Sequence, residues 1–248
     1  MRRNYLVNLG WVGLVITTAL TVEASPVPVD KSWERVSSSD GITTYSKEIS
    51  GAPTVAFLGE ALIDAPVAKV AQVLIDTARK TEWVSDAMIT RDIRQISQLE
   101  RIEYNRTHAP WPIKNRDFVL RCKLELDQVQ KTATVTFSSV PDPAQPETDE
   151  AVRGKVTKGS YIMKSMEGGT KTWVQVEILA DPMGAVPKWA VNLVQRSWPR
   201  KTLTGIQRQV AKPDVIENPE VKAFFEGKLD AYFPVPALPT SVKTASGG

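Results

Sequence analysis

The chain has 248 residues, of which 42% are hydrophobic, 24% charged and 7% aromatic, and this composition excludes a collagen-like, disulfide-dense or wholly disordered protein. Its 31 Lys and Arg residues nearly balance 28 Asp and Glu residues, and a net charge of +3 excludes the strongly basic surface that nucleic-acid binding requires. A single cysteine, Cys122, and a single histidine, His108, exclude an internal disulfide and the usual zinc sites. We therefore expect no nucleic-acid partner, no metal and no cofactor.

Residues 1–24 have the three-part pattern of a secretory signal peptide. Met1–Arg3 is a short basic start, an apolar run follows over residues 9–20, and Val22 and Ala24 occupy the two positions that a signal peptidase reads. An uncleaved membrane anchor is the alternative, although polar residues make this segment a marginal span. We expect cleavage after residue 24 and a periplasmic or secreted mature protein.

The first half of the mature chain predicts strands around one helix pair. Residues 42–49 and 54–63 are β-rich and predict a hairpin. An Asp-Ala-Pro sequence at residues 64–66 then marks a helix start, and apolar residues follow it at helical spacing. The other elements predicted in this half are a short helix over 77–84 and strands over 88–97 and 99–107.

The second half continues with strands and then changes to helix. Alternating residues predict strands over 116–127 and 131–140, and a Pro- and acid-rich loop follows at 141–150. A last pair of strands is expected over 152–166 and 170–179. One helix pair inserted in an antiparallel sheet is an α+β plan.

A long amphipathic helix is predicted over residues 188–210, with Pro187 at its start and a kink rather than an end at Pro199. Such a helix needs a large apolar partner, and a strongly curved sheet is the candidate. We expect the sheet to grip this helix. A helical extension over 213–233 and a disordered tail over 234–248 follow.

Three groups of residues carry a family resemblance. The first is the segment Trp111–Val119, in which a Pro-rich turn leads into Arg-Asp-Phe-Val at the start of a strand. The second group opens the terminal helix, and the third precedes the first strands. Their members are Gly184, Pro187, Trp189 and Asn192, and Trp33, Gly41, Ile42 and Tyr45.

In order and spacing these groups resemble START domains, the lipid-transfer modules related to steroidogenic acute regulatory protein, and the resemblance covers residues 31–210. It implies a helix-grip fold over residues 25–212, with the curved sheet wrapped around the C-terminal helix and an apolar cavity between them. It also implies one lipid ligand, which is a sterol, a phospholipid or a fatty acid, and transient contact with a membrane surface. We expect the protein to act as a monomer.

The resemblance further implies a polar pair in this cavity. Family members often carry a buried acidic residue on the strand before the signature turn, and Glu103 lies at the family's spacing before Arg116. Its predicted partner is Arg121, which strand alternation places on the face opposite Arg116 unless a bulge intervenes. The alternative is that both charged residues face solvent.

Apolar ligand contacts are expected from Phe118, Trp189 and Leu193, with core packing as the alternative for the aromatic side chains. Gly184 and Pro187 are the expected hinge of a lid that the terminal helix forms.

Other features have a structural interpretation. Trp111 is expected to pack in the core, and His108 lies in a turn, which favours a loop histidine over a general base. The aromatic and basic residues at 198–201 either contact an anionic membrane or form a solvated helix face.

The sequence has no nucleophile elbow, phosphate-binding loop or dinucleotide fingerprint. We therefore expect a non-enzymatic lipid carrier. The alternative is a cyclase- or hydrolase-like enzyme that acts on an apolar substrate in the same cavity, and a lipid-sensing module is a third class.

Overall fold

Residues 26–52, 54–186 and 188–228 are the part of the chain that the computed structural model describes. The predicted signal peptide, the predicted tail over 234–248 and the predicted hinge residue Pro187 lie outside these residues.

One antiparallel sheet with the strand order β1-β2-β3-β10-β9-β7-β6-β5-β4 forms the body of the protein, and β8 adds to β6 in parallel. The strands are β1 (Glu34–Ser39), β2 (Ile42–Lys47), β3 (Ala56–Ile63), β4 (Ala87–Ser97), β5 (Glu100–Thr107), β6 (Arg116–Asp127), β7 (Thr132–Ser139), β8 (Val152–Arg153), β9 (Lys155–Met166) and β10 (Lys171–Asp181). The helices are α1 (Val67–Ile75), the 3-10 helices η1 (Thr77–Glu82) and η2 (Glu167–Gly169), α2 (Lys188–Val210) and α3 (Pro219–Phe225).

Two features of the sheet differ from the sequence prediction. Strand β1 was not predicted, because its Arg-Val-Ser-Ser-Ser run is polar and largely exposed. The strand predicted over 152–166 is two strands that separate at Gly154, where the ring of Phe118 leaves no space for a side chain. The chain pairs with β6 before this residue and with β10 after it.

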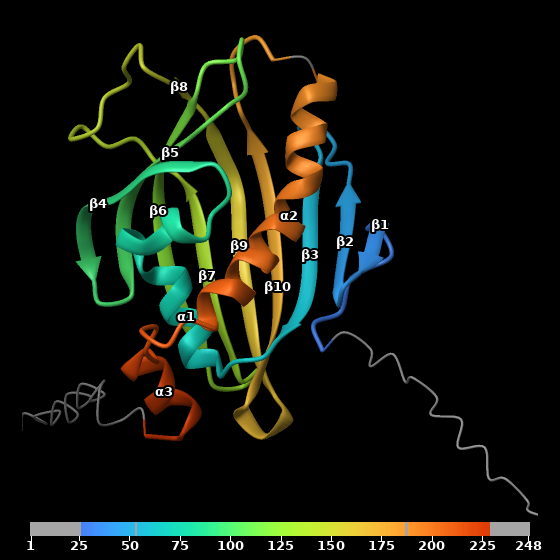
Figure 1. Ribbon diagram of the computed structural model, residues 1–248, viewed down its shortest axis with the longest axis vertical. Helices are drawn as coiled ribbons and strands as arrows, with labels where there is room; N and C mark the ends of the chain where they lie inside the picture. Colours follow the sequence, from blue (N-terminus) through green and yellow to red (C-terminus); the bar gives the residue numbers. More distant parts are fainter. Residues whose placement is uncertain (1–25, 53, 187, 229–248) are drawn as a thin grey trace, which may run out of the picture.

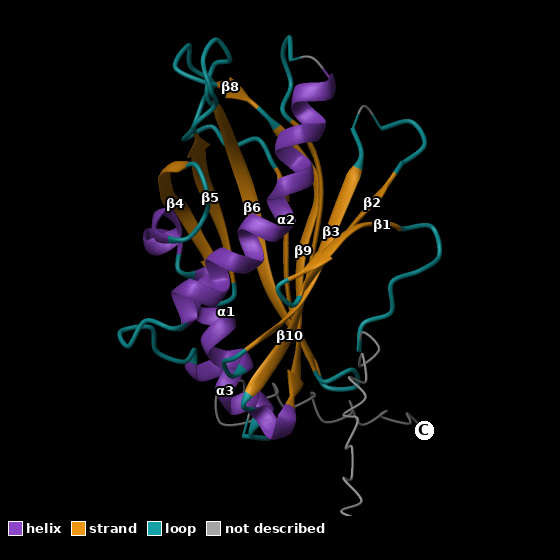
Figure 2. Cartoon of the chain, turned by 45° about the vertical axis from the view of Figure 1, so that its right-hand side comes forward, coloured by secondary structure: helices purple, strands orange, loops and turns teal. Residues whose placement is uncertain are grey.

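The helices α1, α2 and α3 cover one face of the sheet, which we call the inner face, and α2 crosses it diagonally (Figures 1 and 2). α2 continues through Pro199, as predicted, and bends along its length (Figure 1). It touches the sheet at Gly59, where an added Cβ would stand 2.6 Å from Cβ of Pro199. A glycine on β3 therefore allows the helix and the strand to touch.

The C-terminal half of α2 packs into the main hydrophobic core, which we call the closed core. Strands β2, β3, β6, β7, β9 and β10 and all three α-helices contribute to it. Its members with no exposed surface are Ala61, Ile63, Val70, Ala71, Ala133, Met163, Val174, Val176, Leu203, Ile206 and Val221.

The predicted extension over 213–233 is part of this same core as far as it is described. The main-chain N–H of Asn218 donates to the carbonyl of Ala68 at 2.9 Å, which ties the start of α3 to α1. The Asn218 side chain caps α3 by accepting from the N–H of Val221. Among the described helices, none has the length and apolar character needed to cross a membrane.

Candidate functional site

A second apolar cluster lies on the inner face, beside the closed core. We call it the inner patch. It includes four side chains that are only partly buried, so the described residues leave part of its apolar surface uncovered. Its buried members are Leu120, Cys122, Phe137, Val156 and Ala180, and its partly buried members are Phe118, Tyr161, Ile178 and Trp198.

The inner patch lies toward the end of the sheet where α2 begins. It includes the last inward-facing residues of β10, Ile178 and Ala180, and the chain passes from β10 through one loop into α2. The predicted ligand contacts Trp189 and Leu193 belong to the first half of α2, but their side chains are outside the described residues. Phe118 does lie in the patch, and its contact with a ligand stays a prediction.

Glu103 is a buried charge beside the inner patch. The register of β5 on β6 places it opposite Leu120, and only 2% of its surface is exposed. Lys80 of η1 donates to both carboxylate oxygens, at 2.7 and 2.6 Å. The Thr77 hydroxyl and the Asn105 amide donate to the same carboxylate at 3.1 and 3.0 Å. These three side chains make four hydrogen bonds to the carboxylate, which compensates the burial of its charge.

The predicted pair of Glu103 with Arg121 is wrong. Because Glu103 stands opposite Leu120 and side chains alternate along a strand, the next residue, Arg121, points to the outer face. There it pairs with Glu100, and its side chain remains 55% exposed. Sequence reasoning missed Lys80, because nothing local indicates that a residue of the predicted helix over 77–84 meets a strand that follows much later.

The ion pair keeps both of its members charged. Burial alone would raise the pKa of Glu103, but the Lys80 ammonium and its hydrogen bonds outweigh burial and lower that pKa below its ordinary value. Burial alone would lower the pKa of Lys80, and the Glu103 carboxylate raises it above its ordinary value. Burial also raises the pKa of the neighbouring Cys122 thiol well above its ordinary value, so that thiol stays protonated at neutral pH.

Arg116 joins the two loops that border the start of α2. Its Nε donates to the carbonyl of Pro182 and its Nη2 to that of Met183, both at 3.0 Å. Its Nη1 donates to the carbonyl of Lys114 in the β5–β6 loop. The next residue of the β10–α2 loop, Gly184, has a φ of +71°. This backbone conformation would be strained for a residue with a side chain. This conformation fits the predicted hinge, and motion at Gly184 stays a prediction.

Trp111 does not pack in the core, contrary to expectation. It lies in the β5–β6 loop, and 92% of its surface is exposed. Met183, in the β10–α2 loop, is 44% exposed. Arg116 joins these two loops, and both loops lie at the end of the molecule where α2 begins (Figure 1). Trp is enriched at interfaces because its ring is apolar and its N–H is polar, so the exposed Trp111 makes this end a candidate interaction surface.

The aromatic and basic side chains at residues 198–201 contact other parts of the fold. The ring of Trp198 lies 6.4 Å from that of Tyr161, on the inner face. Arg200 donates to the carbonyl of Ile42 at 3.1 Å, and Lys201 pairs with an acidic side chain at 3.3 Å. This cluster fastens α2 to its surroundings.

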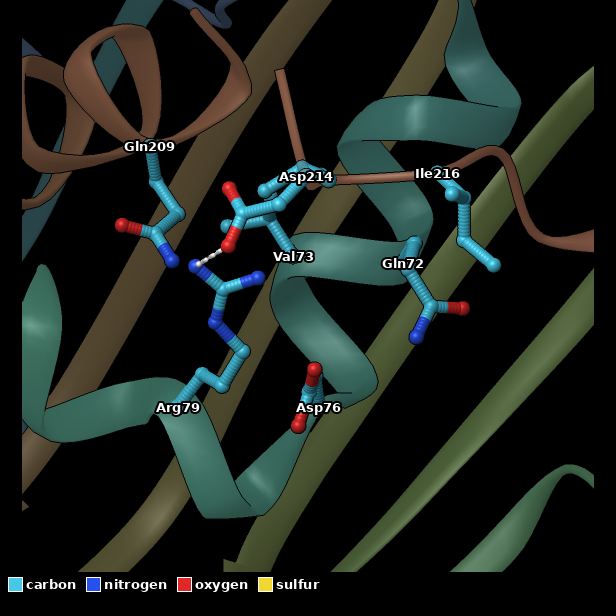
Figure 3. A pocket seen from close by; sticks show the side chains of 8 residues that line it. Gln72, Val73, Asp76, Arg79, Gln209, Asp214 and Ile216 are labelled. Carbon is cyan, nitrogen blue, oxygen red and sulfur yellow. Dashed lines mark ion pairs between the residues drawn. The ribbon is translucent and has the colours of Figure 1, made fainter. Parts of the chain in front are cut away.

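Two cavities are lined mainly by polar side chains, and the larger one also touches Phe137 of the inner patch. Figure 3 shows the first, a polar cavity of about 40 Å³ in which Arg79 points toward Asp214, with 3.0 Å between the paired atoms. Arg79 also donates to Glu82, and hydrogen bonds from Arg79, Lys212 and Gln209 hold the pKa of Glu82 well below its usual range. These contacts lock the end of α2 onto η1. The second is a groove of about 390 Å³ lined largely by charged and hydroxyl side chains, including Glu100, Arg121, Lys123, Thr136 and Lys158.

Comparison with known families and proteins gives consistent matches. The START domain family model matches residues 24–201. The uncharacterized protein PA1579 of Pseudomonas aeruginosa is 26% identical over 186 residues, which are 73% of this chain and 88% of that protein. Human START domain-containing protein 10 is 31% identical over 132 residues, which are 52% of this chain and 43% of that protein.

Solved structures agree on the fold. A fragment of the STAR-related lipid transfer protein from Xanthomonas axonopodis superposes with a TM-score of 0.66 and 26% identity, over 73% of this chain and 99% of that one. Human STARD10 superposes with a TM-score of 0.68 and 20% identity, over 85% of this chain and 84% of that one. These matches confirm the predicted α+β helix-grip fold.

Proposed function

Because this chain belongs to the START domain family, whose members bind lipids, we propose that it is an exported, non-enzymatic carrier that holds one lipid between the inner face of the sheet and α2. The observation that carries the proposal is the inner patch, in which Phe118, Tyr161, Ile178 and Trp198 remain partly uncovered. A bound lipid would cover these side chains and remove its own apolar surface from water, which stabilises the complex by about 25 cal/mol per Å². The solved Xanthomonas relative is named a lipid transfer protein, which is consistent with this role.

The chemistry beside the patch favours a carrier over a hydrolase. Glu103 and Lys80 satisfy each other, which leaves neither as a free general base. Cys122 stays a thiol, and a protonated thiol is a poor nucleophile. Among the described side chains of the patch, the groups that remain can orient a lipid by hydrogen bonds.

Transfer between membranes requires contact with a bilayer, and the end that bears Trp111 and Met183 suits this contact. Trp prefers the membrane interface because its ring is apolar and its N–H can bond to a polar headgroup. Since the β10–α2 loop leads into α2, which adjoins the inner patch, a bilayer at this end would lie near the patch.

Export rests on the pattern of residues 1–24, and it has a direct test. The full chain would be expressed in a bacterium with a C-terminal tag, and the N-terminus of the purified protein would be determined by mass spectrometry. We expect cleavage after Ala24 and recovery from the periplasm or the medium. Recovery of an intact Met1 with the inner membrane would show an anchor instead.

The carrier itself is tested by native mass spectrometry of the purified protein, followed by lipid extraction. We expect a complex with one intact lipid, lost in Ile178→Asn and kept in Leu179→Asn. These variants form a matched pair, because neighbouring residues of β10 point to opposite faces of the sheet. A protein that carries no lipid and moves none between vesicles contradicts the proposal, and release of a cleaved or cyclised product would replace it with the enzyme.

A further inference from the structure

Tyr161 presents an unused hydrogen-bonding group at the inner patch. Its ring stacks on Phe137 at 5.3 Å and lies 6.4 Å from Trp198, so the side chain stands between the sheet and α2. Among the described residues, none forms a hydrogen bond with its hydroxyl. Burial, together with the proximity of Cys122 and Glu103, raises the pKa of Tyr161 well above its ordinary value. A phenol hydroxyl can donate one hydrogen bond, so a ligand in the inner patch can accept one from Tyr161.

Lys80 has a second unused donor nearby. An ammonium group has three N–H donors, and the two carboxylate oxygens of Glu103 are its acceptors among the described residues. Glu103, in contrast, already accepts four hydrogen bonds and has no free site for a donor. Tyr161 and Lys80 are therefore available as hydrogen-bond donors, whereas the acceptor sites of the Glu103 carboxylate are already occupied.

We propose that the inner patch selects a neutral lipid whose polar group is an oxygen acceptor, such as an ester or ketone carbonyl, which Tyr161 and Lys80 bind by donation. This inference rests on the proposed carrier function and specifies the chemistry of its ligand.

The charge balance of the site explains why the ligand is neutral. The pair of Lys80 and Glu103 has no net charge, so a carboxylate or phosphate headgroup would enter the patch as an uncompensated anion. A buried charge without a partner is strongly unfavourable. A cationic headgroup finds the oxygens of Glu103 already occupied and Lys80 beside them. An uncharged acceptor meets neither penalty.

Cis-parinaric acid and its methyl ester test this inference, because they share one fluorescent chain and differ at the carboxyl end. Binding to the full-length protein at pH 8 is followed by the rise in probe fluorescence. We expect the ester to bind at least about ten-fold more tightly than the acid, because the acid is ionised and the ester is not.

Two variants locate the selectivity. Tyr161→Phe should weaken ester binding about five-fold, the effect of one lost hydrogen bond, while Tyr45→Phe, a matched change at a tyrosine that bonds to Glu60, should leave it unchanged. Glu103→Gln leaves the Lys80 ammonium without its anion, so the preference should reverse toward the acid. If Glu103→Gln does not fold, the preference of the wild type for the ester and the results of the two tyrosine variants still test the inference.

The outcomes separate the inference from the proposed function. An acid that binds as tightly as the ester, or ester binding that Tyr161→Phe leaves unchanged, overturns the inference while the carrier stands. If neither probe binds and native mass spectrometry finds no lipid, the carrier function fails, and this inference fails with it.

Discussion

The closed core and the inner patch lie on the same face of one sheet, yet they are packed differently. In the closed core, Leu203 and Ile206 of α2 have no exposed surface, and Gly205 lets the helix approach the carbonyl of Trp83 so closely that a side chain would collide with it. In the inner patch, Phe118 and Ile178 are only partly buried. The difference indicates that the second half of α2 anchors the helix, and the sheet next to its first half is where we propose that the lipid binds.

The largest effect is expected from the ion pair that borders the patch. Lys80→Met leaves the Glu103 carboxylate buried without its cation and should cost about 3–5 kcal/mol in the free energy of unfolding, measured in urea at pH 7. The double variant Lys80→Met with Glu103→Leu should recover most of this loss. A loss below about 1 kcal/mol in the single variant would show that the carboxylate is solvated.

The stability that the pair of Lys80 and Glu103 contributes should decrease at low pH. Because the pKa of Glu103 is lowered in the folded protein, its contribution to stability is complete above the ordinary value of 4.5 and is lost as the pH falls through the lowered pKa. The free energy of unfolding of the wild type, measured in urea, should therefore fall below pH 4.5 more steeply than that of the double variant. Parallel curves for the two proteins would contradict this.

Substitution of Ile206 in the closed core and of Ile178 in the inner patch compares the two regions directly. Ile206→Ala should lower the free energy of unfolding by about 3 kcal/mol, because it opens a cavity in the closed core. Ile178→Ala should lower it by only about 1 kcal/mol. Lipid retention should show the opposite order, with the larger loss in Ile178→Ala. Equal losses of stability would remove the distinction between the closed core and the inner patch.

Gly59→Ala probes the place where α2 touches the sheet. The new methyl group would stand 2.6 Å from Cβ of Pro199, so the helix must shift, at a cost of about 1–3 kcal/mol in unfolding free energy. Since the anchored half of α2 resists this shift, amide hydrogen exchange should rise first in the other half. Unchanged stability would mean that α2 is not held against β3.

The smallest effect on stability, and the largest on membrane binding, is expected from Trp111→Ser. The side chain is 92% exposed, so unfolding should change by less than about 0.5 kcal/mol, while sedimentation with lipid vesicles should fall. Val129→Ser is the control, because Val129 is 88% exposed in the turn at the other end of β6. Equal vesicle binding by both variants would place the membrane contact elsewhere.

Much of the fold could be predicted from local patterns. β6 and α2 have the predicted bounds, because strict alternation marks the strand and a Pro start with apolar helical spacing marks the helix. β1 could not be predicted, since its polar residues form a strand by pairing with β2. The break at Gly154 depends on the Phe118 ring of another strand, which a local pattern does not include.

The site was less predictable, because it depends on contacts between distant residues. The family resemblance identified Glu103 as a buried acid, and the structure confirms its burial. Its cation could not be found, because strand register excludes Arg121 and brings Lys80 from a helix that precedes β5 by many residues. Trp111 was misassigned because aromatic residues are usually buried, and only its place in the β5–β6 loop reveals its exposure.

Labelling of Cys122 tests the location of the ligand most directly. This is the chain's single cysteine, and it lies in the inner patch, so its reaction with the uncharged reagent 4,4′-dithiodipyridine reports on that patch alone. We expect saturating cis-parinaric acid methyl ester to slow the reaction of the folded protein several-fold, and to have no effect in guanidinium chloride. A rate in the folded protein that bound ester leaves unchanged would contradict the central claim that the lipid occupies the inner patch.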